Sequence, residues 1–171
     1  MRTELSDFKF CTVCGGNLEI VFHEGYSRPV CGLCGHVVYV NPIPAACQIV
    51  LDGTNILLVL RAVDPGKGMW CLPGGFIEWG ESPHEGAKRE LFEETGLTAG
   101  KLSHVGIYDG RADSRRHILL IAYRILSWSG EPVAGDDAVQ VKWFDIHDLP
   151  QLAFSSHTQA IRDVLQGEDK R

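Results

Sequence analysis

Three carboxylates near the middle of the chain, Glu90, Glu93 and Glu94, are spaced so that they can hold a metal ion. On a helix, residues three and four positions apart lie on one side, here within a sector about 100° wide. Three like charges this close repel one another, and a divalent cation turns that repulsion into binding. Carboxylate oxygens favour Mg²⁺ or Mn²⁺ over Zn²⁺. The alternative, a solvated charged helix face, stays open on the glutamates alone.

The residues around the carboxylates predict a helix with defined ends. Ser82 is a suitable N-cap, Pro83 fits the first helical position, and Glu85 completes a capping box. Gly96 fits the C-terminal stop. We therefore expect a helix between Pro83 and Gly96 that carries the three carboxylates.

Other side chains in this stretch predict how the helix is positioned. Ala87 and Leu91 supply an apolar stripe beside the carboxylates, so that the helix can dock with its charges at the rim. Arg89 lies four residues before Glu93 and can orient that carboxylate. The Pro73–Gly75 segment permits a sharp turn that brings main-chain carbonyls to the same place.

Composition narrows the class of protein. A length of 171 residues with 44% hydrophobic residues suits one ordinary domain plus a small module. The formal charge of −6 and the lack of a long basic run argue against a non-specific nucleic-acid surface, so an anionic substrate must meet a bound cation and local Arg or Lys. We expect no membrane span and no signal peptide, and therefore a cytoplasmic protein.

Four cysteines near the N-terminus have the spacing of a zinc ribbon. They form two Cys-x-x-Cys pairs separated by sixteen residues: Cys11, Cys14, Cys31 and Cys34. Four thiolates satisfy Zn²⁺ and leave no open position, which predicts a structural site. Two disulfides, or a redox-active pair, are the alternatives. The remaining Cys47 and Cys71 are expected in the core.

We place the ribbon at residues 1–40 and a second domain at residues 41–171. The ribbon has too few apolar residues to fold unaided, and metal binding worth about 10–16 kcal/mol would stabilise it. Because it carries few cations, a packing or dimerisation role is favoured over nucleic-acid binding. A homodimer is therefore expected as one possibility.

The second domain reads as strands joined by turns, with a C-terminal helix that starts at Ser155 or Ser156 and stops at Gly167. The expected strands cover residues 45–51, 56–61, 101–109, 117–127 and 139–144. Between the third and fourth strands we predict a loop over residues 110–116. Cations that could bind the phosphates of an anionic substrate are Arg61 at a strand end and, on that loop, Arg111, Arg115 and Arg116. A surface salt bridge or a solvated turn is the equal alternative.

The whole stretch from Gly75 to Leu97 resembles the Nudix box at each of its fixed positions. The resemblance implies an α/β fold, the Nudix α/β/α sandwich with a mixed sheet, here preceded by the zinc ribbon. It implies hydrolysis of nucleoside diphosphates linked to another moiety, with Mg²⁺ or Mn²⁺. The implied metal ligands are Glu90, Glu93, Glu94 and the Gly75 carbonyl. Glu81 takes an auxiliary position, and Arg89 orients the carboxylates.

Two branches of the family combine such a ribbon with the box. The NADH pyrophosphatase and NAD-decapping branch carries a Ser-Gln-Pro-Trp-Pro-Phe-Pro motif after the box, which is absent from the matching residues 105–111. The chain more closely resembles plant plastid FAD and ADP-ribose pyrophosphatases, over motifs at Tyr39–Pro42, Trp70–Gly75 and Leu152–Ser156. FAD or ADP-ribose, releasing AMP, is thus the expected substrate.

The general base is left open by the resemblance. Some relatives use a box glutamate, for which Glu90 is the candidate, and others use a loop carboxylate at the position of Gln140, which cannot serve. Asp136 and Asp137 lie nearby, and we take Asp137 as the candidate. Five aromatic residues could stack on a base or flavin, although each is more simply a core residue: Trp70, Phe76, Trp79, Tyr108 and Phe154. A ligand sensor or nucleic-acid-binding regulator without catalysis is the alternative from another class.

Overall fold

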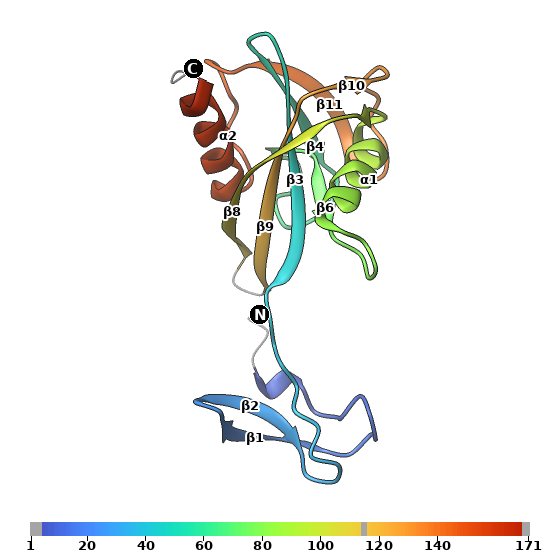
Figure 1. Ribbon diagram of the computed structural model, residues 1–171, viewed down its shortest axis with the longest axis vertical. Coiled ribbons are helices and arrows are strands. Elements are labelled where there is room, and N and C mark those ends of the chain that lie inside the picture. The colour runs from blue at the N-terminus through green and yellow to red at the C-terminus, as the bar shows by residue number, and fades with distance from the viewer. Residues whose placement is uncertain (1–4, 114–115, 169–171) are drawn as a thin grey trace. The chain divides into compact units, whose positions relative to one another are not determined.

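The computed structural model describes residues 5–113 and 116–168 (Figure 1). These residues form two compact units, one that ends at Pro42 and one that begins at Ile43. Among the helices described, none is long and apolar enough to span a membrane.

The first unit is built on a hairpin of two six-residue strands, β1 (Leu18–His23) and β2 (Tyr26–Cys31). They pair antiparallel from Leu18 opposite Cys31 to His23 opposite Tyr26. Glu24 and Gly25 both have positive φ, at 51° and 84°, as a two-residue type I′ turn requires. A short 3₁₀ helix, η1 (Leu5–Asp7), precedes the hairpin.

The second unit contains a seven-stranded mixed sheet and two helices. The main path of the sheet runs β11-β4-β3-β9-β8, with β5 added to β4 and β6 added to β3. The pairing of β3 with β9 is parallel and those with β4 and β6 are antiparallel. The bounds are β3 (Ile43–Asp52), β4 (Asn55–Arg61), β5 (Trp70–Cys71), β6 (Gly74–Phe76), β7 (Thr98–Ala99), β8 (Leu102–Asp113), β9 (Arg116–Ile125), β10 (Trp128–Ser129), β11 (Ala138–Asp145), α1 (Pro83–Thr95) and α2 (Ser155–Glu168).

The two helices cover opposite faces of this sheet. Along β3, Val50 packs in the cluster that contains Leu91 of α1, whereas Ile49 packs in the cluster that contains Ile161 of α2. This alternation is the period of a strand that is buried on both faces. The expected α/β/α sandwich around a mixed sheet is confirmed.

Most expected strands are present, with differences at their ends. The predicted loop over residues 110–116 is wrong at both ends, because β8 continues to Asp113 and β9 begins at Arg116. Gly167 does not stop the last helix, which continues to Glu168. The expected burial of Cys47 and Cys71 is confirmed, and burial raises the pKa of the Cys71 thiol to about 12.

A buried histidine ties α2 to the segment that leads into the glycine turn. His157 is buried, and its Nδ1 accepts a hydrogen bond of 3.1 Å from the backbone N–H of Leu72. Burial, with the nearby charge of Arg61, lowers the pKa of His157 to about 3. The neutral imidazole is therefore part of the packing that positions Pro73 and the two glycines after it.

The depressed pKa of His157 predicts a stability that falls in mild acid. The contribution is complete above the unfolded pKa of about 6.5 and is lost as pH falls from there toward about 3. Between pH 7.5 and 5.5 the free energy of unfolding should fall by about 1 kcal/mol through this group. Urea unfolding of the wild type and of His157→Asn at both pH values measures this fall in the free energy of unfolding. An equal pH dependence in the two proteins would rule out this account.

Candidate functional site

Local sequence fixes both ends of α1, which carries the carboxylates. The Ser82 hydroxyl accepts from the Glu85 N–H at 3.3 Å, and the Glu85 carboxylate accepts from the Ser82 N–H at 2.8 Å. Gly96 closes the helix in a left-handed conformation, at φ 70°, and its N–H donates to Phe92 O at 2.8 Å. The expected capping box and glycine stop are confirmed.

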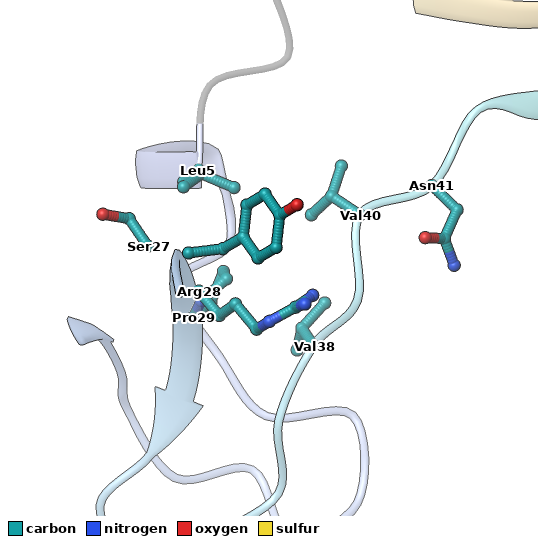
Figure 2. Close-up of a pocket in the computed structure, with 8 residues that line it drawn as sticks. Leu5, Ser27, Arg28, Pro29, Val38, Val40 and Asn41 are labelled. Atoms are coloured by element: carbon teal, nitrogen blue, oxygen red, sulfur yellow. The ribbon is translucent and has the colours of Figure 1, made fainter. Parts of the chain in front are cut away.

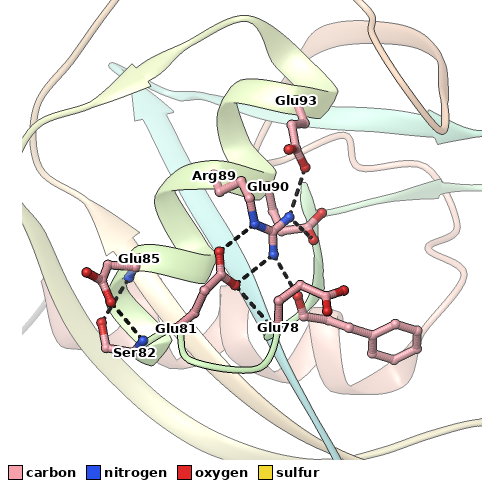
Figure 3. A network of polar contacts seen from close by, with 8 residues as sticks. Glu78, Glu81, Ser82, Glu85, Arg89, Glu90 and Glu93 are labelled. Carbon is pink, nitrogen blue, oxygen red and sulfur yellow. Dashed lines mark hydrogen bonds and ion pairs between the residues drawn. The ribbon is translucent and has the colours of Figure 1, made fainter.

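A single guanidinium joins three carboxylates of the box (Figure 3). Arg89 donates to Glu81 through Nε and Nη2, at 2.6 and 2.9 Å. Its Nη1 donates to Glu90 at 2.7 Å and to Glu93 at 2.8 Å, and its Nη2 donates to Phe76 O at 2.9 Å. The Arg89–Glu93 pair was predicted from its spacing. The family resemblance also implies that Arg89 orients the carboxylates. The bonds to Glu81 and Phe76 O were not predicted, because they depend on the fold of the loop before the helix.

This network also fixes the loop before α1. The bonds from Arg89, followed by a 2.9 Å bond from the Glu78 N–H, lower the pKa of Glu81 to about 2. The same pairing with Glu81 raises the pKa of Arg89 above its ordinary value. Glu81 therefore stays ionised and holds the loop between β6 and α1 against the helix.

Glu94 lies in a different environment from the carboxylates that Arg89 binds. It is only 6% exposed, and its Oε2 accepts from the Gly74 N–H at 2.9 Å. Burial raises the pKa of Glu94 to about 7, against the lowering effect of that bond. Burial likewise raises the pKa of Glu90, against the lowering effect of Arg89. Two partly desolvated carboxylates side by side form a donor set that suits a hard divalent cation.

The two glycines of the turn are required by close approach. A Cβ at Gly75 would lie 2.6 Å from Oε1 of Glu90, and one at Gly74 would lie 2.7 Å from the Cα of Cys47. Gly75 also pairs with Ala46 of β3. Any side chain here would push the helix off the sheet or displace the Glu90 carboxylate.

Arg61 and Asp137 both lie near Glu94. The charge of Arg61 lowers the pKa of Glu94 and that of Asp137 raises it. Arg61 Nε donates to Pro65 O at 2.7 Å, and its guanidinium lies 5.0 Å from the ring centroid of Phe154. The loop that carries Asp137 is held on α1 by a 3.2 Å bond from the Gly135 N–H to Glu94 O. Both candidates therefore lie close enough to Glu94 for their charges to affect its pKa.

The other expected substrate-binding residues are three arginines and five aromatic residues. Arg115 and the side chains of Arg111 and Arg116 lie outside the described residues. The prediction that these aromatic residues pack in the core is correct for three of them. Trp70 packs edge-on against Phe144, Tyr108 donates to Asp163, and Phe154 contacts His157. The prediction is wrong for Phe76, which is exposed, and for Trp79, whose exposure is 101%.

The four N-terminal cysteines form one tight cluster. All four Sγ atoms lie within 4.8 Å of one another, with Cys11–Cys34, Cys14–Cys31 and Cys14–Cys34 separations of 3.7, 3.5 and 3.4 Å. Tetrahedral zinc with bonds of about 2.3 Å needs sulfurs about 3.8 Å apart, whereas a disulfide needs about 2.05 Å. The cysteines are free thiols, so the disulfide alternative is wrong.

The backbone around the cysteines repeats one turn twice. Gly15 N–H donates to Cys11 O at 2.9 Å, and Gly35 N–H donates to Cys31 O at 3.0 Å. The two glycines have φ of 74° and 73°, a conformation that other residues rarely adopt. The matched turns present two thiols each to one point, as a four-thiolate metal site requires.

The carboxylates are less tightly gathered than the thiols. In the part of the chain that the structure describes, Glu90, Glu93 and Glu94 do not converge on one point as the cysteines do. Two of them turn to Arg89 and the third turns to Gly74.

Comparison with known proteins identifies the family. The NUDIX domain model matches residues 41–165. The chain is 37% identical over 150 residues to an ADP-ribose pyrophosphatase of Methanocaldococcus jannaschii, covering 85% of this chain and 88% of that protein. It is 29% identical to the NAD-capped RNA hydrolase NudC of Pseudomonas aeruginosa over 84% of this chain, and the match spans only 50% of that protein.

Solved structures agree with this. A NUDIX hydrolase from Nitrosomonas europaea superposes with a TM-score of 0.75 at 26% identity, over 95% of this chain and 93% of that one. The NUDIX domain of Shewanella oneidensis NrtR, solved with ADP ribose, gives 0.67 at 25% identity over 76% and 90%. The chain belongs to the Nudix family and is a Nudix hydrolase.

The cysteine cluster predicts a stoichiometric structural metal. We expect one zinc ion per chain in the purified protein, by elemental analysis, and its loss in Cys14→Ser. Because metal binding supplies the folding free energy of such small units, hydrogen exchange across β1 and β2 should become fast in the variant while exchange in the core of β3 and β4 stays slow. Cys71→Ser, at a buried thiol of the other unit, should retain the zinc. Full zinc content in Cys14→Ser would contradict the assignment.

Proposed function

We propose that the chain is a Mg²⁺- or Mn²⁺-dependent pyrophosphatase of nucleoside diphosphate derivatives, with ADP-ribose as the favoured substrate, cleaved to AMP and ribose 5-phosphate. FAD is the second substrate of this proposal. The supporting observation is the buried Glu94 with the partly buried Glu90 beside it, next to the glycine turn, in a chain 37% identical to an ADP-ribose pyrophosphatase. The domain boundaries proposed are 1–40 for the ribbon, with Zn²⁺, and 41–171 for the hydrolase.

We assign the metal ligands to Glu90, Glu93, Glu94 and the Gly75 carbonyl. When bound, the cation supplies charge neutralisation of the diphosphate and a water of lowered pKa. Burial around Glu94 supports this assignment, because a carboxylate with a raised pKa gains more from a nearby cation than an exposed one does. Arg89 keeps Glu90 and Glu93 in place before the cation arrives.

The remaining roles concern the substrate and a proton. Asp137 is the proposed base, since its charge reaches Glu94 and the loop that carries it lies on α1. Arg61, whose charge also affects the pKa of Glu94, can bind a phosphate oxygen. Arg111, Arg115 and Arg116 stay proposed substrate contacts from the sequence alone.

NAD-capped RNA or NADH is the second candidate substrate, supported by the likeness to NudC. The lower identity, and the missing motif in residues 105–111, make it less favoured than ADP-ribose. A non-catalytic sensor is disfavoured because the carboxylates, their arginine and the glycine turn are all present.

A substrate panel with one ligand variant tests the proposal. With Mg²⁺, AMP release is expected to be fastest from ADP-ribose, then FAD, with NADH and diadenosine polyphosphates slower. Glu94→Gln keeps the shape of the side chain but removes its charge, so kcat should fall by more than about a hundredfold. No AMP from ADP-ribose or FAD would reject the substrate class. Undiminished turnover by Glu94→Gln would reject the ligand assignment instead.

The guanidinium network predicts that a lysine cannot replace Arg89. Lysine keeps the charge but cannot bond Glu81, Glu90, Glu93 and Phe76 O together. In Arg89→Lys, Mn²⁺ affinity by calorimetry should fall about ten- to a hundredfold. The exposed neighbour Lys88, changed to Arg, is the matched control and should bind Mn²⁺ as the wild type does. Equal affinity in Arg89→Lys would show that the network does not position the ligands.

A further inference from the structure

The first unit contains a cavity that no role proposed so far uses. It has a volume of about 280 Å³ and lies between the hairpin and the segment that leaves it (Figure 2). Its walls are formed by Leu5, Tyr26, Ser27, Arg28, Pro29, Val38, Val40 and Asn41. All of them precede Ile43, so the cavity belongs to this unit alone.

Arg28 is the charged group of the cavity, and two tyrosines stack on it. Its guanidinium carbon lies 5.2 Å from the ring centroid of Tyr26 and 4.4 Å from that of Tyr39. Tyr26 and Arg28 are two residues apart on β2, so their side chains leave the same face of the strand. The buried Nε of Arg28 has no hydrogen-bond partner among the described residues.

This arrangement leaves Arg28 able to bind an oxyanion. Stacked rings engage the faces of a guanidinium, whereas its N–H donors point outward in the plane. A donor that is buried without an acceptor costs free energy, which an incoming oxyanion can recover. Planar, bidentate recognition of this kind fits a phosphate group.

The rest of the cavity suits a nucleoside rather than a bare phosphate. Pro29, Val38 and Val40 provide an apolar wall on which a base can lie, and the Asn41 amide offers both a donor and an acceptor. Tyr26, which lines the cavity, is well exposed, and the face of its ring away from Arg28 can stack on a base. A volume of about 280 Å³ is near the lower limit of small-ligand pockets, about 300 Å³, and so fits a mononucleotide and not a polypeptide segment.

We propose that this cavity binds a nucleoside monophosphate, with the phosphate on Arg28 and the base against Tyr26, Val38 and Val40. Such a site takes the chemical class that a nucleotide pyrophosphatase releases, so it can retain or sense product. The binding itself needs neither the carboxylates of α1 nor a divalent cation there. It therefore stands or falls separately from the proposed hydrolysis.

The test is a titration of the full-length zinc-loaded protein with AMP in buffer without Mg²⁺ or Mn²⁺. Methyl NMR signals of Val38 and Val40 should shift and saturate, and calorimetry should give one matching site. Arg28→Gln should weaken AMP binding more than tenfold, and Arg28→Lys should also weaken it, because lysine lacks the planar fork. Lys9→Gln removes a cation from the same unit outside the cavity, and should leave the affinity unchanged.

Several results would overturn the proposal. Inorganic phosphate that binds as tightly as AMP would show that the nucleoside contributes nothing. AMP that shifts only signals near Glu90, or an affinity in Arg28→Gln equal to the wild type, would show that the cavity is not the site. If zinc content or hairpin signals show that Arg28→Gln is unfolded, Asn41→Ala replaces it, with the expected result of weaker AMP binding and unchanged phosphate binding.

Discussion

The electrostatic attraction of Arg89 for the acidic side chains around it is what makes the rest of the box possible. Glu90 and Glu93 on the helix and Glu81 in the loop before it would repel one another, and a single guanidinium bonds all three. Because the same side chain also bonds Phe76 O, it links the helix to the strand before it. The loop and the metal-facing side of α1 therefore form one unit before any ion binds.

The sheet imposes a second constraint, which is the limited space between its backbone and the carboxylates of α1. Gly74 and Gly75 let β6 pair with β3 while Glu90 and Glu94 approach the same backbone. Burial there raises the pKa values of both carboxylates, so the folded protein keeps a site in which negative charge is poorly solvated. Such a site is a better trap for a divalent cation than an exposed cluster, where water already satisfies the carboxylates.

Many features of the fold and of the candidate site could be predicted from the sequence because they depend on local chemistry. Caps, the three- and four-residue spacing and the paired cysteines each depend on residues close in the chain. The bonds of Arg89 to Glu81 and Phe76 were missed, since they depend on how the loop returns to the helix. The extension of β8 to Asp113 was missed as well, because residues 110–116, with a glycine and three arginines, have the composition of a loop.

The exposed Trp79 is an intrinsic fluorescent probe within the box. It sits in the turn from Glu78 to Glu81, which is closed by a 3.1 Å bond between backbone groups and held to the helix through Glu81. The other three tryptophans, Trp70, Trp128 and Trp143, are all partly shielded. Its indole therefore emits as a water-exposed fluorophore, open to collisional quenchers, and its signal can be separated from theirs. A ligand that binds against this turn therefore changes the tryptophan fluorescence of the protein.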